Sequence, residues 1–145
     1  MQHSDIIFRA VELKDPGLNR ETNRWRTGFF QRVDGISAIV EGGRMIPVDD
    51  KTLGMSSFYK ALKKCSDEEE NIFEGDILEL SSGERLAVVF DDGAFRLADK
   101  FQYTCLVNDV HPFLNDYDEL PTLNSFMLSD APVIAGNVYE NLELL

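Results

Sequence analysis

Short runs of alternating hydrophobic and polar residues, separated by turns that contain glycine, fill most of the chain. A period of two residues is typical of β-strands, and Asp-Gly and Gly-Gly pairs favour the tight turns of β-hairpins. The pattern predicts a first strand over residues 5–13, which ends at the turn Asp15-Pro16-Gly17. It then predicts a three-stranded antiparallel meander over residues 28–48, with turns at Asp34-Gly35 and Gly42-Gly43.

The C-terminal part repeats this pattern. Further strands are predicted over residues 76–80, 85–90, 94–97, 101–107 and 133–139, with turns at Ser81-Ser82-Gly83 and Asp91-Asp92-Gly93. Residues 108–132 contain three of the five prolines and predict a long excursion with one helical turn. Many short, evenly spaced strands favour a small barrel or sandwich over a parallel βαβ sheet. The expected fold class is therefore mainly β, a β-rich α+β protein.

The segment between these two parts carries two signals. Phe58, Ala61, Leu62 and Cys65 recur at the spacing of one helix face, and Ser57 is available as an N-cap, so this pattern alone predicts a short amphipathic helix. The acidic run over residues 66–71 predicts a solvated turn. It marks the expected boundary between an N-terminal region, 1–64, and a C-terminal region, 65–145, which would share a core as one cooperative unit.

Charge is distributed unevenly between these regions. Residues 1–64 hold 11 Lys and Arg against 8 Asp and Glu, whereas residues 65–145 hold 3 against 18, and the whole chain has a net charge of −12. An excess of 15 negative charges repels phosphate backbones, so nucleic-acid contact is expected only from the N-terminal region. The 145 residues, 43% of them hydrophobic, are enough to bury a core in one domain or two small ones.

The sequence offers little support for catalysis or membrane insertion. No apolar run approaches the roughly 20 residues that cross a bilayer, and residues 1–5 lack a secretory pattern, so we expect a cytoplasmic protein. Cys65 and Cys105 lack the spacing of a zinc site or disulfide framework. His3 and His111 are the only histidines, and no phosphate-binding or nucleophile motif occurs. We expect no enzyme activity, no cofactor and no metal.

One basic and aromatic segment has the composition of a binding surface. Its first part, residues 18–27, has no clear period and is predicted as a loop or a strand edge. The candidate interaction residues are Arg20, Arg24, Trp25, Arg26 and Arg32. Arginine and aromatic side chains stack on bases or anchor protein interfaces. The interpretation that we favour is that these arginines pair with the acidic region or with a second subunit, while Trp25 and Phe29 or Phe30 enter the core.

A second candidate is a group of carboxylates beside a glycine. Glu74 and Asp76 flank Gly75, and alternate residues of a strand share a face, so together with Asp91 or Asp92 they would offer oxygen ligands to a metal. The structural alternative is stronger. In it, Gly75 adopts a turn conformation and the Asp76 carboxylate accepts local backbone N–H bonds.

Several segments resemble the YopX family of phage and prophage proteins. They are Ile7-Phe8-Arg9-Ala10, Ile72-Phe73-Glu74-Gly75-Asp76-Ile77-Leu78, residues 88–95 and, most specifically, residues 134–145. The resemblance implies a mostly β fold with an SH3-like barrel in the C-terminal half, after the N-terminal meander. It implies a phage or prophage origin, and it supplies no catalytic residues. The structural motif residues that it marks are Glu74, Gly75, Asp76, Gly136, Asn137 and Tyr139.

The chain departs from the family pattern at two places. Val11 stands where the family usually has tryptophan. Residues 58–62 and the acidic run replace a segment that contains a glycine turn in the family. Because that glycine favours extended chain, the resemblance predicts an extended conformation for residues 59–63 against the helical pattern.

The leading hypothesis is a non-enzymatic accessory protein of phage type that acts through protein–protein contacts with an unknown phage or host protein. Opposite charges on the two regions and the prevalence of symmetric oligomers also predict a homo-oligomer. One alternative is a nucleic-acid-binding module that uses residues 20–32, and a third is a metal hydrolase near Glu74 and Asp76. We also expect Leu142, Leu144 and Leu145 to fold back onto the barrel, because exposed leucines would form an apolar patch.

Overall fold

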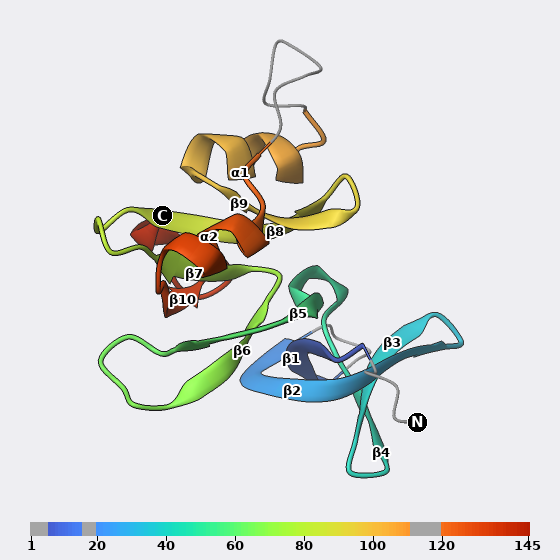
Figure 1. Ribbon diagram of the computed structural model, residues 1–145. Helices are drawn as coiled ribbons and strands as arrows, with labels where there is room; N and C mark the ends of the chain where they lie inside the picture. The colour runs from blue at the N-terminus through green and yellow to red at the C-terminus, as the bar shows by residue number, and fades with distance from the viewer. Residues whose placement is uncertain (1–5, 16–19, 111–119) are drawn as a thin grey trace. The chain divides into compact units, whose positions relative to one another are not determined.

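The computed structural model describes residues 6–15, 20–110 and 120–145 (Figure 1). Pro16 and Gly17 of the first predicted turn, and both histidines, His3 and His111, lie outside these ranges. The fold is mainly β, as predicted, and it divides into two compact units, Met1–Ser56 and Ser57–Leu145. No helix within the described ranges is long and apolar enough to span a membrane.

The N-terminal unit is an antiparallel sheet. Its elements are β1 (Phe8–Asp15), β2 (Arg20–Val33), β3 (Ile36–Glu41), β4 (Arg44–Pro47), the 3₁₀ helix η1 (Asp50–Thr52) and the start of β5 (Gly54–Leu62). The strand order is β4-β3-β2-β1-β5, and the predicted meander is β2, β3 and β4. Both of its turns, at Asp34-Gly35 and Gly42-Gly43, have positive φ, as the hairpin motif requires. The basic stretch is not a loop, because β2 begins at Arg20 and pairs with β1.

A small core holds this unit together. Ala10, Ile39 and Val48 are buried, and Phe8 and Leu53 pack against them. Strands β2 and β3 approach so closely that a Cβ atom at Gly28 would lie 2.1 Å from the carbonyl oxygen of Val40. The core therefore combines few side chains with close backbone contact.

The C-terminal unit contains a second antiparallel sheet and the helices. Its elements are β6 (Glu69–Phe73), β7 (Asp76–Glu79), β8 (Arg85–Asp91), β9 (Ala94–Ala98), α1 (Lys100–Val107), α2 (Leu123–Ser129), β10 (Val133–Asn137) and the 3₁₀ helix η2 (Leu142–Leu144). The strand order of this sheet is β10-β7-β8-β9, and α1 packs against β8 and β9 (Figure 1). Closure of these strands into an SH3-like barrel stays a prediction of the family resemblance.

The main core of the C-terminal unit lies between this sheet, β5 and α2. Its fully buried members include Ile72, Leu78, Val88, Leu97 and Leu123. A smaller cluster of Ile77, Ala87 and Val138 lies under the C-terminal end of the chain.

The boundary between the units falls before residue 57 rather than after Lys64. Residues 57–62 are the later part of β5, which neighbours β6 in the second unit, and the Ser57 hydroxyl donates to the Ile72 carbonyl at 2.7 Å. The extended conformation implied by the family resemblance is therefore confirmed, and the helical pattern is wrong. Pairing with β6 outweighs the weak helix signal of a ten-residue segment.

Two other local predictions are wrong. Residues 101–107 form helix α1 rather than a strand, because the Asp99 side chain and Gln102 make a reciprocal capping box at its N-terminus. The acidic run is a turn only in its first half, since Glu69 begins strand β6.

The end of the chain is partly structural, as expected. Leu144 and Leu145 pack against the cluster of Ile77, Ala87 and Val138, whereas Leu142 is exposed. The expectation for Leu142 is therefore wrong, because η2 directs it to solvent.

We predict that Leu144→Ala lowers the free energy of unfolding by about 1–2 kcal/mol, less than the roughly 2–5 kcal/mol for a fully buried leucine. The matched control, Leu142→Ala, removes the same atoms from an exposed position and should change it by less than about 0.5 kcal/mol. Urea denaturation of both variants measures the difference. Equal effects would contradict the packing of the C-terminal residues.

Candidate functional site

Two arginines of the predicted surface, Arg26 and Arg32, form ion pairs inside the N-terminal unit. The Arg26 guanidinium lies 3.3 Å from Glu12 and 3.3 Å from Glu41, and it is mostly buried. Arg32 pairs with Asp50 at 3.2 Å. For Arg26 and Arg32 the expected pairing with the acidic region is therefore wrong, since β2 places them beside acids of their own unit. Pairing with a second subunit stays a prediction.

The other members of that surface differ in their exposure and in their contacts. Trp25 is half-buried, and the Arg9 guanidinium lies 4.9 Å from its ring centroid. Arg24 is exposed, and the side chain of Arg20 lies outside the described part of the structure. Phe30 packs on Phe8 with ring centroids 5.7 Å apart, as expected of a core aromatic, whereas Phe29 is 52% exposed.

The observed boundary also changes the charge map. Residues 1–56 hold 8 Lys and Arg and 8 Asp and Glu, a net charge of zero, while residues 57–145 hold 6 and 18, a net charge of −12. The N-terminal unit is therefore neutral rather than basic, because Lys60, Lys63 and Lys64 belong to the acidic unit.

A tight turn between β6 and β7 is the structural centre of the acidic unit. Asp76 is 1% exposed, and its carboxylate accepts the Phe73 backbone N–H at 2.8 Å. Gly75 has φ +96°, its N–H donates to the Val88 carbonyl, and its carbonyl accepts from the Val138 N–H, each at 2.8 Å. These contacts confirm the structural interpretation of Gly75 and Asp76.

The carboxylates do not assemble the metal site considered for this turn. Among the described residues, no group of three or more His, Cys, Asp or Glu is placed to hold a metal ion. The Asp76 carboxylate accepts a hydrogen bond from the backbone of its own turn.

The motif that contains Gly136 and Asn137 positions Tyr139 over the Gly75 turn. The Asn137 side-chain oxygen accepts the backbone N–H groups of Tyr139 and Glu140, each at 3.0 Å. At Gly136, a Cβ atom would lie 2.6 Å from the Asn141 side-chain oxygen, so the turn closes tightly. The Tyr139 ring in turn lies so close to Gly75 that a Cβ atom there would be 2.8 Å from its Cε2.

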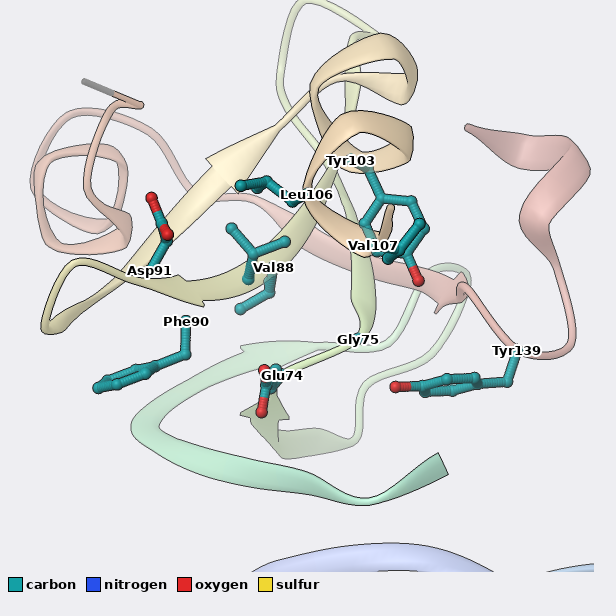
Figure 2. A pocket seen from close by; sticks show the side chains of 10 residues that line it. Glu74, Gly75, Val88, Phe90, Asp91, Tyr103, Leu106, Val107 and Tyr139 are labelled. Carbon is teal, nitrogen blue, oxygen red and sulfur yellow. The ribbon is translucent and has the colours of Figure 1, made fainter. Parts of the chain in front are cut away.

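A pocket of about 220 Å³ opens beside these two motifs (Figure 2). Its lining residues are Glu74, Gly75, Val88, Val89, Phe90, Asp91, Tyr103, Leu106, Val107 and Tyr139. Three of the segments that carry the family resemblance thus meet here, and α1 provides the remaining wall. In Figure 2 the Tyr139 hydroxyl points toward Glu74, and Tyr103 extends from α1 into the same space.

The pocket combines an apolar wall with an acidic interior. Burial raises the pKa of the Tyr103 hydroxyl, and the negative charge of Glu74 raises it further. Phe90, Val107 and Tyr139 are 44%, 60% and 39% exposed and form an apolar rim. Such an arrangement suits a ligand that has an apolar part and a polar or positively charged end.

A known protein family matches the region of the chain that contains this pocket. The family model described as YopX protein matches residues 65–145, which is more than half of the chain. The chain belongs to the YopX family. No curated protein matches the chain. The YopX match includes every residue that lines the pocket, so the pocket lies wholly within the part that is typical of the family.

The sequence motifs mark Glu74, Gly75 and Tyr139 but give no sign of the α1 wall. Tyr103, Leu106 and Val107 lie in residues 101–107, whose alternating pattern predicts a strand. The signal that would have found them is the Asp-x-x-Gln spacing of Asp99 and Gln102, which is typical of a helix N-terminus.

We predict that Tyr103 titrates above its ordinary pKa near 10 and that Tyr103→Phe removes this late component of the tyrosine titration. Glu74→Gln should lower the pKa of Tyr103 without restoring its ordinary value, because burial is the larger cause of the shift. The matched control is Asp92→Asn, which removes one charge from an exposed turn outside the pocket and should leave the pKa of Tyr103 unchanged. Ultraviolet absorbance of the phenolate measures all four proteins.

The raised pKa of Tyr103 also determines how the stability of the fold changes with pH. The pKa of Tyr103 is higher in the folded than in the unfolded chain. The contribution of Tyr103 to the free energy of unfolding is therefore complete below the ordinary pKa near 10, and it decreases as the pH rises above that value. Urea denaturation between about pH 9 and pH 11 should show a smaller loss of stability for Tyr103→Phe than for the unchanged protein. An identical loss of stability in Tyr103→Phe and in the unchanged protein would contradict the burial of Tyr103.

Proposed function

We propose that this YopX-family chain is a non-enzymatic accessory protein of phage or prophage type that acts in the cytoplasm of a bacterial host. It works through protein–protein contacts, and one of its partners is a second copy of itself. The observation that carries this proposal is an exposed apolar face on the neutral N-terminal unit.

This face lies on the meander of β2, β3 and β4. We call it the meander face, and its members are Phe29, Val33, Ile36 and Met45, which are between 39% and 52% exposed. Strand register places them on one side of the sheet, because Val33 pairs with Ile36 while Val40 pairs with both Phe29 and Met45. Phe29 and Val33 are four residues apart in β2, so they share that side.

Phe29 and Met45 flank Val40 at one end of this face, and Val33 pairs with Ile36 at the other end, so two groups of large apolar side chains are exposed to water. Burial returns about 25 cal/mol for each Å² of apolar surface that is covered, and contiguous exposed patches mark interaction sites. The turns Asp34-Gly35 and Gly42-Gly43 connect these strands without adding side chains that would cover the face. The face therefore suits an apolar protein partner.

A second copy fits this face because the unit that carries it has no net charge. Two copies of the neutral unit approach each other without the repulsion that 12 excess negative charges create between two acidic units. A two-fold arrangement also presents the same residues from both sides, as closed symmetric dimers do.

The nucleic-acid alternative has weaker support. Arg26 and Arg32 pair with Glu12, Glu41 and Asp50, which neutralise the charges that phosphate groups would need. The metal hydrolase alternative has no carboxylate cluster among the described residues to support it.

We predict that the full chain sediments as a dimer or larger species at tens of micromolar protein and moderate salt. The double variant Phe29→Thr with Met45→Thr should sediment as a monomer with an unchanged melting temperature, since both positions are exposed. Leu128→Gln is the matched control, because Leu128 is 80% exposed on α2 of the other unit and its replacement should preserve self-association.

A monomeric unchanged protein, or a double variant that still self-associates, would contradict the proposal. A mobility shift of DNA or RNA at nanomolar protein that Arg24→Ala with Arg26→Ala abolishes would favour the nucleic-acid alternative instead. Non-specific binding weaker than about 10⁻⁶ M at physiological salt would agree with the proposal.

A further inference from the structure

We propose that the pocket between the Gly75 turn, β8 and α1 binds the guanidinium group of an arginine side chain from a partner protein. This inference deepens the proposed function by naming the chemistry of a second contact, on the acidic unit. It rests on the proposed function only in taking the ligand to be part of a protein.

The size of the pocket favours a single side chain. Its volume of about 220 Å³ is below the roughly 300–1,000 Å³ that is typical of pockets for drug-sized ligands. Leu106 and Val107 supply an aliphatic wall on which the methylene groups of a long side chain would pack. The rest of the partner would remain outside, against the apolar rim of Phe90, Val107 and Tyr139.

The polar part of the pocket favours a planar cation. Glu74 offers a carboxylate, and Tyr103 and Tyr139 offer aromatic rings and hydroxyl oxygens around the same space (Figure 2). A guanidinium stacks on aromatic rings and donates two parallel hydrogen bonds to a carboxylate, which an ammonium group does less well. The raised pKa of Tyr103 beside Glu74 agrees with a negative potential that repels anions.

The described residues that line the pocket include no Lys, Arg or His. Four of the basic side chains have contacts of their own: Lys63 with Glu70, Lys64 and Arg85 with Glu79, and Arg96 with the carbonyls of Asp91 and Leu120. The net charge of −12 on the unit also favours a positively charged partner.

The experiment compares two small probes on the full chain labelled with ¹⁵N. The probes are Nα-acetyl-argininamide and Nα-acetyl-citrullinamide, which has nearly the same shape but no charge. We expect the arginine probe to shift the amide signals of Gly75, Val107 and Tyr139 with a Kd of about 1 mM, as befits a ligand of this size. The citrulline probe should bind roughly tenfold more weakly, because it lacks the charged hydrogen bonds.

Variants place the binding at the pocket. Glu74→Gln should weaken the arginine probe roughly tenfold and remove its advantage over citrulline. Tyr139→Leu should also weaken it, because the aromatic ring is lost. The matched control Asp92→Asn, with the same change in net charge, should bind as the unchanged protein does. The amide spectrum of each variant verifies that it is folded.

Equal binding of the two probes, shifts confined to other residues, or an equal effect of Glu74→Gln and Asp92→Asn would overturn this inference. The outcome is separable from that of the proposed function, because the probe binds a monomer and a dimer alike. If the probe fails while the protein still sediments as a dimer, the pocket inference alone is wrong. If the probe binds to a protein that is always monomeric, self-association alone is wrong.

Discussion

The contact on which the acidic unit most depends is the hydrogen bond from the Phe73 backbone N–H to the buried Asp76 carboxylate. It closes the turn that contains Glu74 and Gly75. The backbone of Gly75 then bonds to Val88 on β8 and to Val138 after β10, so one turn connects three segments that are distant in the sequence. The Tyr139 ring occupies the space that the missing side chain of Gly75 leaves. The floor of the pocket is thus a consequence of this turn.

The two units have different surface chemistry, and each suits a different contact. The N-terminal unit is neutral and pairs Arg26 and Arg32 with its own acids, which leaves the apolar meander face as its distinctive surface. The C-terminal unit carries the excess negative charge and the pocket that contains Glu74. An apolar face favours a neutral partner surface, and an acidic pocket favours a cation. We infer that the chain uses both kinds of contact.

Much of this arrangement was predictable where local chemistry decides the structure. The glycine turns of the meander and the roles of Gly75 and Asp76 follow from short-range rules, and the structure confirms them. The prediction was wrong where distant contacts or caps decide, as in residues 57–62, where pairing with β6 overrides a helical pattern. Helix α1 was missed because its apolar positions also suit a strand, while its capping box is formed by Asp99 and Gln102. The pocket forms where segments that are distant in the sequence come together. The periodicity of hydrophobic residues does not predict such contacts.

The most direct test of this account is amide hydrogen exchange of Asp76→Ala in the full chain. Loss of the carboxylate should speed exchange at Phe73, Gly75 and Val138 by at least about tenfold, since a hydrogen bond to a charged group contributes about 1.5–3 kcal/mol. Exchange in the meander should be unchanged, as should exchange throughout the matched control Asp67→Ala, in which an exposed carboxylate is removed. Unchanged protection of Gly75 and Val138 in folded Asp76→Ala would contradict the claim that this turn holds the pocket together.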